Sequence, residues 1–279
     1  MDKLARTLKI GCIQLKVGAN KAENIARAVS KIRDAKNLGA ELIALPECFN
    51  SPYGVSFFPQ YAETIPDGET SKKLSDIAKE LGVYLVAGSI PEIKNEKYFN
   101  TSTVWGPKGD LIATYRKMHL FDIDIPGEIT FKESDALSAG NQLTVFDVKD
   151  FKIGVGICYD IRFEELAKLY RKKGCNMLIY PGAFNMKTGP LHWELLARSR
   201  ANDNQCYTAL ISPARDESAQ YVAWGHTMTV DPWGKILQSS ASCEDVFVTE
   251  LDLAVVEKVR SNIPIFSQRR NEIYDTVKK

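Results

Sequence analysis

Apolar residues recur at two different spacings along the first third of the chain. Continuous or alternating apolar runs are typical of strands, whereas apolar residues three and four apart are typical of a helix face. On this basis the sequence predicts strands at 8–15, 41–47 and 83–89 and helices at 25–35 and 74–81. Gly39 and Gly82 follow the two helical patterns as stop signals. This part of the chain therefore alternates between strands and helices.

The middle of the chain has the pattern of antiparallel hairpins, because short polar turns separate neighbouring apolar runs. The sequence predicts one hairpin from 100–105 and 111–117 and a second from 143–148 and 151–157. Farther along we expect helices at 163–170 and 191–204, strands at 176–180, 206–212 and 220–226, and a turn at 232–234. That turn is expected to lie between two later strands.

These elements predict an α/β protein whose sheets are covered by helices. The hairpins favour a mixed sheet, or two packed sheets with helices outside, over a purely parallel barrel. The sequence contains no internal repeat with a period of roughly 20 to 50 residues, and it contains no Pro- or Ser-rich linker. We therefore expect a single domain over residues 1–279.

Composition and charge exclude several classes of protein. The chain is 44% hydrophobic and 25% charged, which is typical of a soluble globular protein and not of a disordered one. Its 36 Lys and Arg against 35 Asp and Glu give a net charge of +1, so nothing indicates a nucleic-acid partner. No apolar run approaches the ~20 residues of a membrane-spanning helix, and no signal-peptide pattern opens the chain. We expect a cytoplasmic protein with no membrane partner.

Cysteine and histidine usage argues against disulfides and against zinc. The six cysteines form no CxxC pair, so reduced thiols are expected. The three histidines (His119, His192 and His226) are not spaced as metal ligands with one another or with a cysteine. We expect no metal site. We interpret His192 as a structural residue, and His226 lies either at an interface or at a pocket edge.

Two segments place a reactive side chain directly after a predicted buried strand, where α/β sheets bind their ligands. Glu47 follows an apolar run and a proline, although a solvated loop carboxylate is an equal alternative. Cys158 ends a strand shortly before a helix, where free N–H groups and the helix dipole favour the thiolate. An inert buried thiol describes Cys12, Cys175 and Cys206 better than it describes Cys158.

Several motifs together resemble those of the nitrilase superfamily, and in particular its omega-amidase branch. They are LPECFNSPY, YRKMHLFDIDIPG, GICYDIRFEELA, YPGAFNMKTGPLHWELLARSRANDNQ and QYVAWGH, and the similarity runs nearly from end to end. The resemblance implies an α-β-β-α sandwich and maps the catalytic triad of the superfamily onto Glu47, Lys117 and Cys158. It also implies a second, supporting glutamate, which matches Glu133, with Glu128 as a competitor.

The resemblance implies amide hydrolysis through a thioester, without a metal or an organic cofactor. Cys158 is expected to attack the amide carbon, with Glu47 as general base and then as acid to the departing ammonia. Lys117 and the backbone N–H of Tyr159 are expected to hold the oxyanion. The lysine charge is also expected to lower the pKa of the thiol.

The omega-amidase resemblance implies short dicarboxylate monoamides as substrates, such as 2-oxoglutaramate and 2-oxosuccinamate. Arg162, four residues after the nucleophile, is the candidate for the distal carboxylate. The alternative is a structural ion pair with Asp160 or Glu164. The motif positions that either complete the pocket or serve only in packing are Tyr53, Phe184 and Thr188.

Other functions stay open within and outside the superfamily. Deaminated glutathione is a competing substrate, and hydrolysis of a nitrile would use the same thiol. A non-catalytic binding protein is a different class, and the intact triad argues against it. The superfamily commonly forms homodimers, so the polar tail at 266–279 is expected to cross to a partner subunit. Segment 121–133 is long enough for a lid, and an additional mitochondrial pool stays open.

Overall fold

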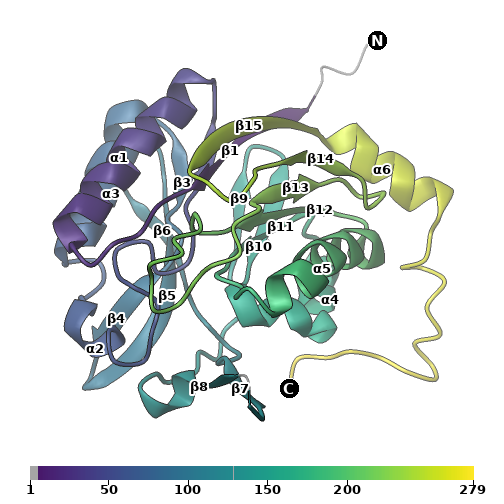
Figure 1. The fold of residues 1–279 in the computed structure, drawn as a ribbon. Helices are drawn as coiled ribbons and strands as arrows, with labels where there is room; N and C mark the ends of the chain where they lie inside the picture. The colour runs from purple at the N-terminus through teal and green to yellow at the C-terminus, as the bar shows by residue number, and fades with distance from the viewer. Residues whose placement is uncertain (1–5, 128) are drawn as a thin grey trace.

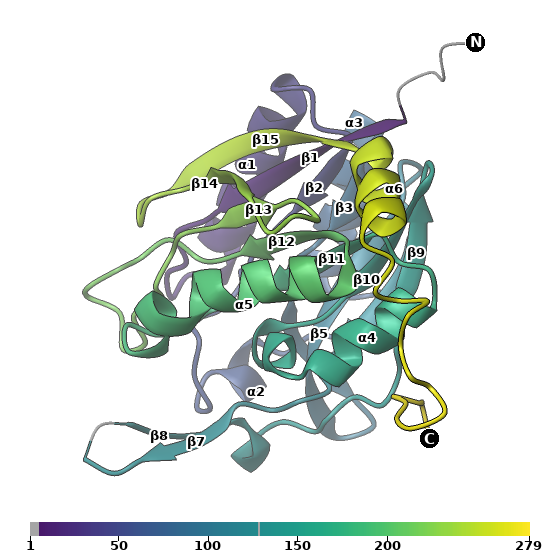
Figure 2. The same cartoon turned by 90° about the vertical axis from the view of Figure 1, so that its right-hand side faces the viewer.

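Two β-sheets pack against each other in the middle of the molecule, and helices cover their outer faces (Figure 1). The computed structural model describes residues 6–127 and 129–279. A view turned by 90° shows α5 (Thr188–Asn204) and α4 (Glu164–Lys172) in front of the second sheet (Figure 2). The α/β class and the expected α-β-β-α layers are confirmed.

The first sheet joins the two ends of the described chain. Its strands, in spatial order, are β15 (Asp245–Asp252), β1 (Thr7–Gln14), β2 (Leu42–Ala44), β3 (Tyr84–Val86), β5 (Lys97–Trp105) and β4 (Ile90–Lys94), with β6 (Leu111–Arg116) also beside β5. The pairs β1–β2 and β2–β3 are parallel, and β15 pairs antiparallel with β1 along its whole length. Helices α1 (Lys21–Asn37) and α3 (Glu69–Leu81) connect the parallel strands and cover their outer face. The short α2 (Phe58–Tyr61) precedes α3.

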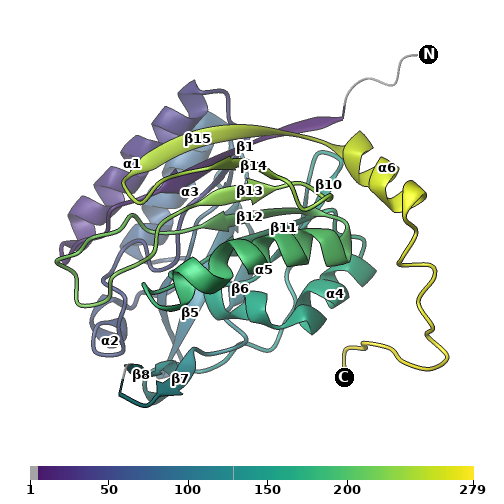
Figure 3. The ribbon, with the colours of Figure 1, turned by 45° about the vertical axis from the view of Figure 1, so that its right-hand side comes forward.

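The second sheet repeats this plan. Its order is β14 (Ile236–Ser239), β13 (Met228–Val230), β12 (Tyr207–Ile211), β11 (Met177–Pro181), β10 (Phe151–Val155) and β9 (Val145–Val148). The central strands β10, β11 and β12 are parallel, and α4 and α5 connect them. Both helices lie over the outer face of the sheet (Figure 3). The last helix, α6 (Leu253–Asn262), follows β15, and the small hairpin of β7 (Asp122–Ile125) and β8 (Ile129–Lys132) lies apart from both sheets.

The largest apolar core fills the space between the sheets. Alternation along a strand sends neighbouring side chains to opposite faces. A Cβ on Gly154 would lie 2.7 Å from the ring of Tyr170 in α4, so position 154 faces the helices. Ile153 therefore faces the first sheet, and it belongs to one buried cluster with Leu8 and Ile10 of β1. This apolar cluster packs one sheet against the other.

Most predicted elements are present, with corrections at six places. Strands β4 and β15 and helix α6 were not predicted, and neither was the β7–β8 hairpin. Segment 220–226, predicted as a strand, is a loop with a single bridge at Ala223. The reason is its backbone, because Gly225 and His226 both have positive φ values that end an extended strand. Helix α5 begins at Thr188, three residues before its predicted start at 191.

The tail after α6 has turns but no helix or strand over residues 263–279. It packs along α4, where Lys172 forms an ion pair with Asp275 and the guanidinium of Arg171 lies 4.3 Å from the ring centre of Phe266. Among the described residues, no helix combines the length and the apolar character needed to cross a bilayer.

Three strand ends bring the candidate residues together. Glu47 follows β2 by three residues, Lys117 follows β6 directly, and Cys158 follows β10 by three residues. The first two strands belong to one sheet and the third to the other. The packing between the sheets therefore sets the distances within the candidate site.

We expect Ile153→Ala to lower the free energy of unfolding by about 2–5 kcal/mol, because it leaves a cavity between the sheets. The control is Leu38→Ala, which shortens a side chain that is 57% exposed. That change should stay within about 0.5 kcal/mol. Urea unfolding followed by circular dichroism measures both variants, and equal effects would contradict the position assigned to Ile153.

Candidate active site

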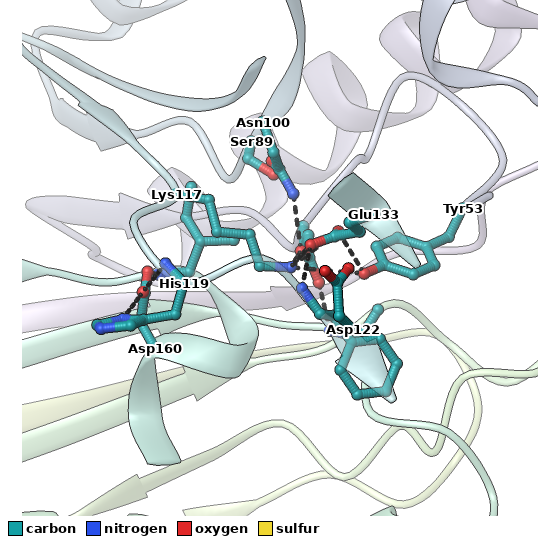
Figure 4. A network of polar contacts seen from close by, with 12 residues as sticks. Tyr53, Ser89, Asn100, Lys117, His119, Asp122, Glu133 and Asp160 are labelled. Carbon is teal, nitrogen blue, oxygen red and sulfur yellow. Dashed lines mark hydrogen bonds and ion pairs between the residues drawn. The ribbon is translucent and has the colours of Figure 1, made fainter. Parts of the chain in front are cut away.

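A buried lysine lies between two buried glutamates, and Figure 4 shows one of these contacts, between Lys117 and Glu133. Lys117 Nζ is 2.9 Å from Glu47 Oε1 and 2.9 Å from Glu133 Oε1, and all three side chains are 0% exposed. The structure thus brings together three of the four residues that the resemblance assigned to catalysis. The competing Glu128 lies outside the described residues.

Other groups complete the hydrogen bonding of the two carboxylates. Asn100 Nδ2 donates to Glu47 Oε1 at 2.8 Å, and the backbone N–H of Ala183 donates to Glu47 Oε2 at 2.8 Å. Glu133 accepts from the Tyr53 hydroxyl and from the backbone N–H of Phe121, both at 2.7 Å. Sequence reasoning missed Asn100, although a polar side chain within a predicted strand was a signal for it.

The Cys158 thiol is next to Glu47. Cys158 begins the 3₁₀-helix η2 (Cys158–Arg162), and its φ of 48° is in the left-handed region that residues other than glycine rarely adopt. This turn places the thiol within hydrogen-bond reach of the Glu47 carboxylate, and only 4% of the residue is exposed. The four predicted catalytic residues therefore form one cluster.

The charges of the cluster shift its proton affinities. Burial and then the Glu47 charge raise the pKa of the Cys158 thiol well above its usual value, and Lys117 offsets only part of this. Burial would lower the pKa of Lys117, but Glu133 and Glu47 raise it well above its usual value. Burial raises the pKa of Glu47, against the opposing charge of Lys117. Lys117 thus lowers the pKa of the thiol as expected, but burial outweighs this contribution and the net shift is upward.

Arg162 has no carboxylate partner among the described residues. Its NH1 lies 3.2 Å from His192 Nδ1, and its guanidinium lies 4.8 Å from the ring centre of Phe184. The alternative ion pairs are contradicted, because Glu164 pairs with Lys168 and Asp160 accepts hydrogen bonds from other residues. A half-buried guanidinium without an acid beside it is suited to an anionic ligand.

The remaining predicted pocket residues have mixed roles. The Tyr53 hydroxyl is committed to Glu133, while its ring borders a cavity of about 290 Å³ that also reaches Glu47 and Tyr221. Phe184 belongs to the buried core, where its ring contacts Trp193 and the guanidinium of Arg162, and its role as a pocket wall stays a prediction.

Two other predicted pocket residues differ in what they contact. Thr188 donates through its hydroxyl and its backbone N–H to Asn185 Oδ1, which favours its structural role. The Tyr159 ring lies 5.7 Å from the Arg162 guanidinium and 5.2 Å from the ring of Phe121. Tyr159 therefore contacts the candidate substrate-binding residue Arg162, whereas Thr188 bonds to Asn185.

Aromatic contacts join the β7–β8 hairpin to the site. Phe131 of β8 stacks on Tyr53, with ring centres 5.6 Å apart and an interplanar angle of 14°. Phe131 also contacts Phe121 and Tyr221. The expected lid segment therefore covers Tyr53 in this structure, and its movement stays a prediction.

The arrangement has the parts needed for attack on an acyl carbon. A thiol lies beside a carboxylate whose pKa is raised, and a buried lysine lies 2.9 Å from that carboxylate. The three histidines have other partners: His226 stacks on Trp224, His192 contacts Arg162, and His119 contacts Asp160. Across residues 6–127 and 129–279, no group of His, Cys, Asp and Glu is arranged to hold a metal ion.

The chain is similar over nearly its full length to proteins of one family. The carbon-nitrogen hydrolase family model matches residues 9–261. An omega-amidase of Bos taurus is 52% identical over 273 residues, which cover 98% of this chain and 99% of that protein. An omega-amidase of Xenopus tropicalis is 54% identical, covering 97% of this chain and 98% of that protein. A solved Saccharomyces cerevisiae structure, from branch 10 of the nitrilase superfamily, matches with a TM-score of 0.87 and 43% identity, covering 95% and 97% of the two chains.

We expect Lys117→Met to lower the free energy of unfolding by about 3–5 kcal/mol at pH 8, because it leaves two buried carboxylates without a cation. Losing the cation raises the pKa of Glu47 further, so the folded state binds more protons than the unfolded state. Stability then increases as the pH falls, and the deficit should shrink between pH 8 and pH 5.

Urea unfolding at both pH values measures this change. The double variant Lys117→Met/Glu133→Gln removes one of the two negative charges and should recover part of the loss. Lys31→Met serves as a surface control, since Lys31 pairs only with the half-exposed Asp34 among the described residues. A deficit that is equal at both pH values would contradict the electrostatic explanation.

Proposed function

The chain belongs to the carbon-nitrogen hydrolase family, and from that premise we propose that it is an omega-amidase with Cys158 as its nucleophile. It would hydrolyse the terminal amide of 2-oxoglutaramate to 2-oxoglutarate, and that of 2-oxosuccinamate to oxaloacetate, and release ammonia. The observation that carries the proposal is the contact of the Cys158 thiol with Glu47 beside the buried Lys117. Relatives named omega-amidases, more than half identical over nearly the whole chain, support it.

The first half of the reaction forms a thioester. Cys158 Sγ attacks the amide carbon while its proton passes to Glu47, whose raised pKa suits a group that must hold that proton near neutral pH. Lys117 Nζ carries three protons and directs two of them to Glu47 and Glu133 at 2.9 Å, and its third, longer contact is with the Tyr53 hydroxyl at 3.5 Å. In this proposal the third proton leaves that hydroxyl and donates to the oxyanion. The backbone N–H of Tyr159 is the second oxyanion donor in this proposal.

The first half ends with loss of ammonia, which completes the thioester, and the second half returns the free thiol. Glu47 gives its proton to the leaving nitrogen, and the C–N bond breaks to release ammonia. Water then attacks the thioester carbon, with Glu47 taking one of its protons. The C–S bond breaks, and that proton returns to Sγ as the carboxylic acid leaves. Glu133 holds Lys117 in place through both halves.

Arg162 supplies the preference for a second carboxylate in the substrate. Its guanidinium is half-buried near the thiol and, within the described part of the chain, faces no acid. A bidentate contact with a carboxylate would satisfy it. This favours a 2-oxo dicarboxylate monoamide over an uncharged amide or a nitrile.

The same proposal includes a homodimer and a cytoplasmic location. Leu191 and Leu195 of α5 are 62% and 60% exposed, and Ile273, Tyr274 and Val277 of the tail are exposed as well. Exposed apolar side chains gathered on one helix and a terminal segment support an interface between subunits.

We expect ammonia release from 2-oxoglutaramate by the wild-type chain and no measurable release by Cys158→Ala, because the variant has no nucleophile. The matched control is Cys243→Ala, which removes an exposed thiol and should keep full activity. A glutamate dehydrogenase-coupled assay measures the ammonia. If the folded wild-type chain releases none, the omega-amidase proposal is wrong, and deaminated glutathione becomes the substrate to test next.

We expect Arg162→Gln to lower kcat/KM for 2-oxoglutaramate by about 30- to 5,000-fold, since losing one partner of a buried charge pair costs roughly 2–5 kcal/mol. The slow hydrolysis of butyramide, which has no carboxylate, should change by less than about 3-fold if Arg162 acts only on that group. Steady-state kinetics with both amides separate the two effects. Equal losses on the two substrates would exclude Arg162 as the carboxylate site.

A further inference from the structure

Asp160 is a fully buried carboxylate with four hydrogen bonds, and the mechanism above does not use it. Its Oδ2 accepts from the backbone N–H of Ile157 and from the Tyr115 hydroxyl, both at 2.8 Å. Its Oδ1 accepts from the backbone N–H of His119 at 2.9 Å and is 2.7 Å from His119 Nδ1 (Figure 4). Since a carboxylate oxygen of this kind only accepts, His119 carries a proton on Nδ1.

These contacts connect the two segments that carry the nucleophile and the lysine. Ile157 precedes Cys158 in the turn after β10, so its bond to Asp160 stabilises the left-handed backbone at the thiol. Tyr115 lies in β6, two residues before Lys117, and His119 lies two residues after Lys117 in the segment that follows β6. Strands β6 and β10 belong to different sheets, so Asp160 bridges between them at the site.

The surroundings of Asp160 leave it no freedom to move. A Cβ on Gly156 would lie 3.2 Å from the Asp160 Cβ and 2.6 Å from an atom of the Tyr180 ring, so this approach requires glycine. The His119 ring stacks on Phe163 with centres 3.7 Å apart and an interplanar angle of 9°. Close packing at Gly156 thus restricts Asp160, and stacking on Phe163 restricts the His119 ring.

We propose that Asp160 is a positioning residue that sets the distance between Lys117 Nζ and the Cys158 thiol, acting through His119 and Tyr115. The inference rests on the proposed function, because it assigns Lys117 and Cys158 their roles. Asp160 does not touch the reacting atoms, and its four hydrogen bonds occupy the lone pairs that a proton acceptor would need. Its effect is on the geometry of the transition state.

Asp160→Asn tests this with little change in size. The amide group replaces one acceptor oxygen with an NH₂ that faces donors, so the bridge is partly broken. We expect kcat for 2-oxoglutaramate to fall about 10- to 100-fold, as small misplacements of catalytic groups do. KM should stay within about 2-fold. Arg162 remains in place, since Arg200 of α5 donates to the carbonyls of Ile161 and Arg162.

A second readout does not depend on hydrolysis. Iodoacetamide should alkylate Cys158 at least about 3-fold more slowly in Asp160→Asn at pH 8, because a more distant Lys117 lowers the thiolate fraction. This measurement retains its meaning if the chain does not hydrolyse 2-oxoglutaramate. Failure of the proposed function and failure of this inference are thereby distinguished. The Cys158→Ala variant gives the background from the other thiols.

Glu63→Gln is the matched control, because it also weakens a buried carboxylate. Glu63 accepts from the backbone N–H and the hydroxyl of Thr70 at 2.8 and 2.6 Å, and it contacts none of the four catalytic candidates. We expect a comparable loss of Tm with kcat and alkylation unchanged. If the ratio of the loss of kcat to the loss of Tm is the same in Asp160→Asn and Glu63→Gln, Asp160 has only a structural role and the inference is overturned.

Two variants of His119 provide a test that does not depend on the folding of Asp160→Asn. His119→Asn keeps a donor near the position of Nδ1 and should retain kcat within about 3-fold of wild type, whereas His119→Ala should lose about 10-fold. Equal activity of these two variants would overturn the inference, as would unchanged kcat and alkylation in Asp160→Asn.

Discussion

The rest of the site depends on one cation held away from water. Removing a lysine and two glutamates from solvent is expensive, and the arrangement is stable only if each charge finds its partners. Lys117 lies between Glu47 and Glu133, and Asn100, Ala183, Tyr53 and Phe121 supply the remaining donors. Each of these groups must therefore stay within hydrogen-bond distance of a buried charge, because an unpaired charge there would be costly.

That constraint explains why the site lies between two sheets. The loop that carries the lysine comes from one sheet and the thiol from the other, so neither sheet contains a complete site. The apolar layer between the sheets supplies the rigidity, and the polar contacts at its edge supply the alignment. Close packing of this kind transmits small displacements, which is why core and catalysis are coupled here.

The sequence predicted those parts whose signal is local. The periodic helices α1 and α3 end at or near glycines as expected, and motif resemblance placed Glu47, Lys117, Glu133 and Cys158 together. It missed β15, whose place is set by pairing with β1 at the far end of the chain. The sequence also did not show that burial raises the pKa of the thiol overall, since burial is a property of the assembled sheets and not of neighbouring residues. The commitment of the Tyr53 hydroxyl to Glu133, 80 residues away, was hidden for the same reason.

The pairing of β1 with β15 has a consequence during protein synthesis. These strands lie at opposite ends of the chain, and their register runs from Thr7 with Asp252 to Gln14 with Asp245. One edge of β1 therefore has no strand beside it until residues 245–252 have been made. An unpaired edge in a growing chain is open to association with other chains. For this protein, β15 completes the sheet whose strands β2 and β6 lead to Glu47 and Lys117, so a chain that stops before residue 245 lacks that strand and leaves an edge open to aggregation.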